Sequence, residues 1–145
     1  MKLMPTSASV NLVVAVLICS VTVASQAQDI DSRWRLQIVD PNHRIKVDAT
    51  VRFDGKPASE SCMGGTWKRV VVETKDAQDE EFFPLAEPLA YQLKDGNLTL
   101  GRTAVCDGYL FLSGRSGQST IQGTYDAVSI GTGRKLGYFT LKRVP

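Results

Sequence analysis

The chain has 145 residues, of which 43% are hydrophobic, 8% aromatic and 22% charged. This length suits one domain, and the composition is that of an ordinary globular protein. It excludes a disordered tail, a collagen-like fibre and a multi-pass membrane protein. The formal net charge is only +2, so we expect no nucleic-acid partner.

The first 27 residues have the order of a secretory signal peptide. Lys2 is the only charge before Asp29, an apolar run spans residues 12–19, and Ser25-Gln26-Ala27 offers a small-residue cleavage site. The apolar core is shorter than the roughly 20 residues that an uncleaved membrane anchor needs. Ile18 before Cys19 disfavours a lipoprotein. We therefore expect a signal peptide over 1–27, a single domain over 28–145, and no membrane span after cleavage.

Cleavage would remove one of the three cysteines and leave Cys62 and Cys106. An even pair in an exported chain favours a disulfide, with two free thiols as the alternative. The sequence thus predicts a periplasmic or secreted protein with one disulfide.

The first part of the expected domain alternates as strands do. Residues 32–39 place Trp34, Leu36 and Ile38 on one face. After a turn at 40–43, residues 44–53 place an apolar residue at every odd position from Ile45 to Phe53. Period two with one apolar face is typical of half-buried antiparallel strands.

Further along, short strands are expected in regular succession. They cover residues 66–74, 89–94, 98–101, 109–113, 119–130 and 136–142. Pro84 and Pro88 disfavour a helix between the first two of these strands, and the turn at Asp95-Gly96 favours a hairpin. About eight sequential strands predict a small antiparallel up-and-down β-barrel, with a two-layer β-sandwich as the alternative.

The residues needed for catalysis are scarce. His43 is the only histidine and lies in an expected turn. No nucleophile, phosphate-loop or dinucleotide motif accompanies it. One histidine and two cysteines expected to be oxidised are too few for a zinc site. The acidic run at residues 79–81 is expected to be a solvated face, or a contact for a basic partner. We expect no enzyme, no metal and no cofactor.

Two sets of residues are candidates for binding. Tyrosines and a tryptophan could hold an apolar ligand at the mouth of the barrel; they are Trp67, Tyr91, Tyr109 and Tyr125. Glycine-bearing loops tied together by the disulfide, at one end of the barrel, could instead present a rigid surface; their residues are Met63, Gly64, Gly65, Asp107 and Gly108.

These features predict a non-enzymatic exported binding protein that acts through its loops on another protein. An inhibitor of an envelope hydrolase, such as a lysozyme or a protease, is the concrete form of this hypothesis. The alternative is a lipocalin-like carrier of a small apolar ligand. The state of the barrel interior distinguishes them, because a filled core favours the first function and a large cavity the second.

Overall fold

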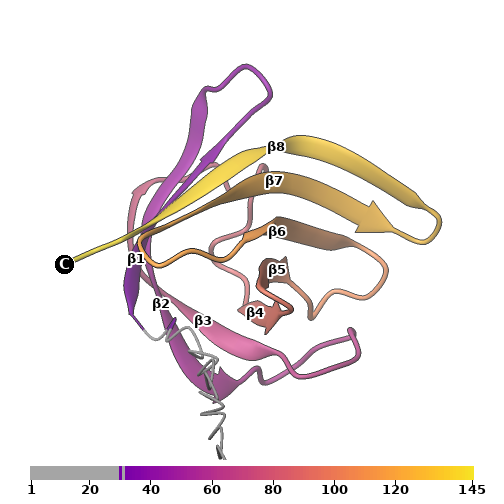
Figure 1. Ribbon diagram of the computed structural model, residues 1–145. Coiled ribbons are helices and arrows are strands. Elements are labelled where there is room, and N and C mark those ends of the chain that lie inside the picture. The colour runs from indigo at the N-terminus through magenta and orange to yellow at the C-terminus, as the bar shows by residue number, and fades with distance from the viewer. Residues whose placement is uncertain (1–29, 31) are drawn as a thin grey trace, which may run out of the picture.

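The computed structural model describes residue 30 and residues 32–145, in which eight antiparallel strands form a closed barrel (Figure 1). Residues 1–27, expected to form the leader, lie outside the described residues. The strands are β1 (Arg33–Val39), β2 (Ile45–Pro57), β3 (Lys68–Ala77), β4 (Leu89–Lys94), β5 (Asn97–Arg102), β6 (Tyr109–Arg115), β7 (Thr120–Ser129) and β8 (Thr132–Arg143). The expected up-and-down barrel is confirmed, and the strands do not separate into a two-layer sandwich.

Each strand pairs with the next in sequence, and β8 closes the barrel by pairing with β1 from Trp34↔Arg143 to Val39↔Tyr138. Closure leaves most strands with neighbours on both sides, which protects their edges. The β3–β4 contact is the shortest, with only three residue pairs, Lys68↔Tyr91 to Val70↔Leu89. From residue 71 onward, β3 has β2 as its only strand partner.

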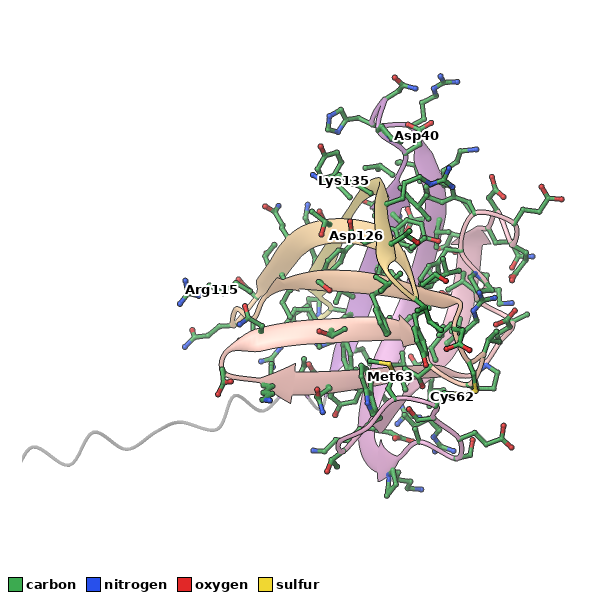
Figure 2. All side chains as sticks on the ribbon, turned by 90° about the vertical axis from the view of Figure 1, so that its right-hand side faces the viewer. Asp40, Cys62, Met63, Arg115, Asp126 and Lys135 are labelled. Atoms are coloured by element: carbon green, nitrogen blue, oxygen red, sulfur yellow. A yellow bond between two sulfur atoms is a disulfide. The ribbon has the colours of Figure 1, made fainter. Side chains whose placement is uncertain are left out.

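Alternation along the strands fills the barrel with side chains. Val47, Ala49, Val51 and Phe53 of β2 are buried, as the period-two pattern predicts. Ile45 is an exception, with 54% of its surface exposed. It lies at the start of β2, where the β1–β2 hairpin stands clear of the barrel with Asp40 at its tip (Figures 1 and 2), so no core is available there to cover it.

The connection between β3 and β4 closes one end of the barrel. Phe83 and Leu85 from this connection belong to the buried core, and Phe83 packs edge-on against Tyr125 with ring centroids 5.4 Å apart. Asp79 holds the turn, because its backbone oxygen accepts hydrogen bonds from the amides of Phe82 and Phe83. The connection therefore contributes to the core rather than only joining two strands.

The connection between β2 and β3 folds back along the outer wall of the barrel. Trp67 at its end stacks on Phe111 of β6, with ring centroids 5.9 Å apart, and Phe111 stacks on Tyr109 at 5.6 Å. These outward-facing rings form a second apolar cluster together with Ala90, and Met63 packs against it. The cluster explains why β6 is apolar on both faces.

Candidate functional site

The disulfide joins connections that leave the barrel at opposite ends. Cys62 and Cys106 are bonded with their Cα atoms 5.3 Å apart (Figure 2). In an up-and-down barrel the β2–β3 and β5–β6 connections start at opposite ends, so the expectation that both loops lie at one end is wrong. They meet because the β2–β3 connection runs back over the wall, where the Cys62 amide donates to the Thr103 carbonyl at 2.9 Å.

Buried contacts make the β5–β6 loop a fixed platform. Thr103 at its start is 1% exposed. The Arg102 guanidinium donates to the Gly108 carbonyl at 2.7 Å and to the Glu87 carboxylate at 3.3 Å. The loop is thus held at its start, at the disulfide and at its end.

Exposed apolar side chains gather beside this loop. Val105 is 42% exposed, Val128 is 37% exposed, and Ile130 in the β7–β8 turn is 80% exposed. Tyr109 is half-buried and directly opposite Val128 in the β6–β7 register. The Val105 side chain lies close to Gly108 at the end of the same loop, because a Cβ atom on Gly108 would be 3.9 Å from Val105 Cγ1. We call Val105, Tyr109, Val128 and Ile130 the rim patch.

A hollow of about 490 Å³ adjoins the rim patch and is lined by two of its residues, Tyr109 and Val128. Its apolar lining comes from β6 and β7, and Arg134 of β8 stands at its edge. Arg134 is exposed and forms no ion pair within the described part of the chain. The hollow therefore combines an apolar surface with one available positive charge.

The predicted loop residues divide into two groups. Gly64 and Gly65 lie against the wall, where the Gly64 carbonyl accepts a hydrogen bond from Trp67 Nε1 at 3.0 Å. Asp107 and Gly108 lie in the β5–β6 loop, and Gly108 lines the rim hollow. Met63, Gly64 and Gly65 therefore hold one loop against the barrel, whereas Asp107 and Gly108 adjoin the rim patch.

The predicted ligand-binding aromatics also divide. Tyr91 and Tyr125 are buried in the barrel core, at 1% and 0% exposure. Trp67 packs on the outer wall, and Tyr109 reaches from the same cluster to the rim hollow. Only Tyr109 of these four contributes to a surface that a partner could reach from the rim.

The barrel centre is occupied by aromatic rings. Phe53 and Tyr91 pack edge-on with centroids 4.7 Å apart, and the Tyr125 hydroxyl donates to the Phe82 carbonyl. Burial raises the pKa of Tyr125 far above its usual value. These tyrosines therefore serve as core residues.

Sequence reasoning missed Val105, Val128, Ile130 and Arg134. The sequence of β7 did indicate Val128. Ile121 and Tyr125 face inward, and alternate residues of a strand face opposite sides, so Val128 faces outward. An apolar residue on the outward face of a strand end indicates a surface for contact rather than for the core.

The charged candidates are used within the fold. In the acidic run, Asp79 pairs with Lys46 at 2.9 Å and Glu80 pairs with Lys75 at 3.3 Å. His43 stacks on Tyr138 with ring centroids 5.5 Å apart. Among the described residues, no group of three or more histidine, cysteine or acidic side chains is placed to hold a metal. No described helix is long and apolar enough to cross a membrane.

Comparisons with protein-family models, with curated proteins and with solved structures give no match to this chain.

Proposed function

We propose that this chain is an exported, non-enzymatic binding protein that engages a protein partner through the rim patch. The observation that carries the proposal is the exposure of Val105 in a disulfide-anchored loop and of Val128 and Ile130 at the end of the β7–β8 hairpin, where Val128 is paired with Tyr109 beside that loop. Apolar side chains on a rigid support lose little conformational freedom on association, so more of their burial contributes to affinity. Central apolar anchors of this kind dominate the energetics of many interfaces.

An envelope hydrolase is the partner class we would test first. The disulfide is compatible with the periplasm or the extracellular space, where such enzymes act. A fixed loop beside an apolar rim can occupy an enzyme cleft without being reshaped by it. Inhibition of a lysozyme or a protease is the specific form of the proposal.

A small-molecule carrier is the second candidate, and the rim hollow is the observation that favours it. Its volume of about 490 Å³ falls within the range of small-molecule sites. Because aromatic rings occupy the barrel centre, such a ligand would bind at the rim, beside Tyr109 and Arg134. This differs from a lipocalin-like site deep inside the barrel.

Capture from a native envelope extract tests the proposal. The full chain, expressed with its leader and purified from the envelope fraction, is immobilised as wild type, Ile130→Asp and Ile45→Asp. Ile45 is a matched control because it is also an exposed isoleucine in a hairpin, away from the rim patch. We expect a protein retained by wild type and Ile45→Asp, and lost with Ile130→Asp.

Retained proteins are then assayed for cell-wall-lytic and proteolytic activity with and without the purified chain. If no protein is retained and a lipid or small molecule co-purifies instead, the carrier replaces the protein binder. Equal loss of capture in the Ile130 and Ile45 variants would also contradict the proposal, since the rim patch would then have no special role.

A further inference from the structure

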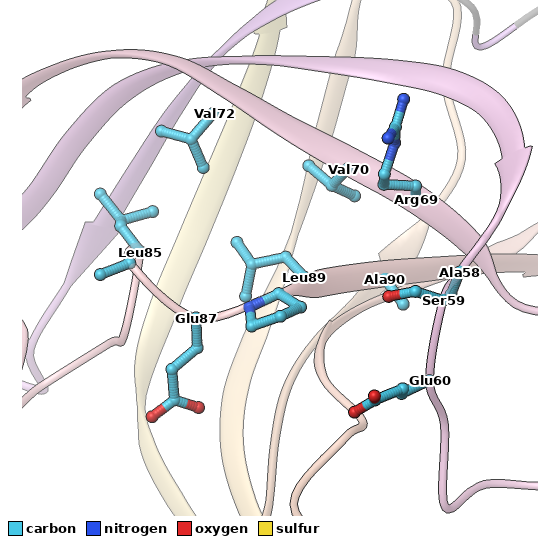
Figure 3. A pocket seen from close by; sticks show the side chains of 12 residues that line it. Ala58, Ser59, Glu60, Arg69, Val70, Val72, Leu85, Glu87, Leu89 and Ala90 are labelled. Atoms are coloured by element: carbon cyan, nitrogen blue, oxygen red, sulfur yellow. The ribbon is translucent and has the colours of Figure 1, made fainter.

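A second hollow, which we call the seam pocket, opens where β3 and β4 separate (Figure 3). Strand pairing between them ends at Val70↔Leu89, and the chain before β4 runs below β3 without joining the sheet. The pocket has a volume of about 250 Å³. It is therefore a small opening in the barrel wall, separate from the rim hollow.

The walls of the seam pocket are apolar. Val70 and Val72 come from β3, and Leu85 and Leu89 come from the opposite side, with their side chains directed toward the space between (Figure 3). Val70, Leu85 and Leu89 also belong to the barrel core. The pocket floor is thus a fixed part of the core and offers an apolar surface to one long side chain.

The mouth of the seam pocket carries excess negative charge. Arg69 is neutralised by an ion pair with Asp54, and Glu87 is paired with Arg102 at 3.3 Å. Glu60 is exposed and forms no ion pair with any residue in the described ranges. One uncompensated carboxylate therefore stands beside an apolar cavity, and a second carboxylate of the lining, that of Glu87, has a partly exposed ion pair.

We propose that the seam pocket receives a lysine or arginine side chain of the protein partner. Such a side chain has an apolar stem that suits Val70, Val72 and Leu89, and a cationic end group that suits the unpaired carboxylate of Glu60. An anion would be repelled by Glu60, and a purely apolar group would gain no ion pair with that carboxylate.

This inference rests on the proposed function, because the occupant belongs to the protein partner. Arg102 shows that the two surfaces adjoin, since one guanidinium contacts Glu87 of the seam pocket and Gly108 of the rim hollow. A partner seated on the rim patch would therefore lie next to the seam pocket. The basic side chain would then belong to the part of the partner that lies over the β5–β6 loop.

The test uses small probes, so that it does not depend on finding the partner. The ¹⁵N-labelled full chain is titrated with n-pentylammonium, with 1-pentanol and with pentanoate, and amide shifts are followed by NMR. We expect saturable shifts at Val70, Val72 and Leu89, strongest for pentylammonium, weaker for pentanol and weakest for pentanoate. Glu60→Gln should weaken pentylammonium binding about two- to fivefold, as expected for an exposed ion pair.

Glu81→Gln is the matched control. Glu81 is an exposed acidic residue with no ion pair in the described part of the chain, and it does not line the seam pocket. Its variant should bind pentylammonium as wild type does. If Glu60→Gln is poorly folded, the order of the three probes on the wild-type chain decides the question alone.

Equal binding of pentylammonium and pentanoate, or no shifts at the pocket residues, would overturn the inference. So would an equal effect of the Glu60 and Glu81 variants. If the probes do not bind but a partner is captured, the proposed function stands and only the assignment of a basic side chain to the seam pocket is wrong. If capture does not depend on Ile130, the proposed function itself is wrong.

Discussion

Asp48 of β2 accepts three side-chain hydrogen bonds from the neighbouring strand β1. Its carboxylate accepts hydrogen bonds from Arg35 Nε and Nη2, and from Gln37 Nε2, each at 2.8 Å. Asp48 is itself buried, with 7% of its surface exposed, whereas the Arg35 side chain is 55% exposed. Removing the negative charge would therefore weaken a pairing that joins β1 to β2.

We expect Asp48→Asn to lower the free energy of unfolding by about 1–2 kcal/mol, because one charge-assisted pairing becomes a weaker neutral one. Urea unfolding at pH 7 measures this difference. Asp107→Asn is the control, since Asp107 is exposed and its positive φ of 62° suits asparagine equally well. Equal stability of the two variants would show that the Asp48 contacts contribute nothing.

Sequence reasoning at this scale identified the buried face but not the polar partners. The spacing of Ile121 and Tyr125 correctly places both side chains on the inward face of β7. The hydrogen bond from Tyr125 to the Phe82 carbonyl joins residues 43 positions apart. A local pattern contains no information about such a contact, because it depends on how the β3–β4 connection enters the barrel.

At the scale of elements, the sequence predicted strands correctly where two neighbouring strands are joined by a short turn with a clear sequence signal. The predicted strand at 89–94 coincides with β4, and the turn at Asp95-Gly96 joins it to β5 as expected. β8 begins at Thr132, four residues earlier than predicted, because Gly131 with a φ of 75° allows a tight hairpin after β7. The sequence pattern places residues 132–135 before this strand, outside it.

Close strand contact makes Gly123 of β7 essential for the barrel. A Cβ atom at this position would lie 1.9 Å from the Ser113 carbonyl oxygen and 2.7 Å from Gly114 Cα. Both neighbours are backbone atoms of β6, so neither can move without breaking the strand pair. We expect Gly123→Ala to destabilise the fold by about 3 kcal/mol or more, since severe overpacking exceeds the usual cost.

Gly133→Ala provides the control, because a Cβ atom there would have no neighbour within 4 Å. Its thermal unfolding midpoint should equal or slightly exceed that of wild type, since alanine restricts the unfolded chain. The two variants carry the same chemical change, so their difference isolates the contact with β6. A Gly123→Ala protein with an unchanged midpoint would contradict this role of Gly123.

The disulfide stabilises the β2–β3 connection, which folds back along the outer wall of the barrel. It closes a loop with a sequence separation of 44 residues, for which the chain-entropy argument gives at most about 4 kcal/mol. This loop includes β3 and its short pairing with β4. We expect the double variant Cys62→Ala, Cys106→Ala to unfold at a clearly lower urea concentration than wild type.

Reduction of the wild-type protein with dithiothreitol should lower its stability to that of the double variant, and should leave the double variant unchanged. Capture of a partner through the rim patch should also weaken, because the β5–β6 loop loses one of its anchors. A midpoint that does not respond to reduction would show that the hydrogen bond between Cys62 and Thr103 and the packing of Trp67 hold the loop without the disulfide.

At the scale of the whole molecule, the candidate site is assembled from distant parts of the chain. Val105 comes from the β5–β6 loop, Ile130 from the β7–β8 turn, and the Cys62 anchor from the β2–β3 connection. The number and alternation of strands predicted the barrel and its closure. Which connections meet depends on the way that the β2–β3 connection folds back, and neither composition nor periodicity specifies that path.

Hydrogen-bonded carboxyl groups of the strands and connections give the whole molecule a definite response to acid. Each of five carboxyl groups has a pKa below its usual range because it accepts hydrogen bonds in the fold. The donors are the Arg44 amide for Asp40, Arg35 for Asp48, Arg69 for Asp54, Arg33 and Arg52 for Glu73, and Lys46 for Asp79. These groups bind protons less readily in the folded chain than in the unfolded chain.

As the pH falls below about 5, the unfolded chain therefore takes up more protons than the folded chain, and the free energy of unfolding decreases. The stabilisation is fully present above the unfolded pKa values and is lost as the pH falls through the lower folded values. Urea unfolding between pH 6 and pH 2.5 should show this decline, and Asp48→Asn should show a smaller one. Because the arginine and lysine partners of these carboxylates are largely exposed, 1 M salt should reduce the slope. Stability that rises on acidification would contradict the assignment of these five hydrogen-bonded carboxylates.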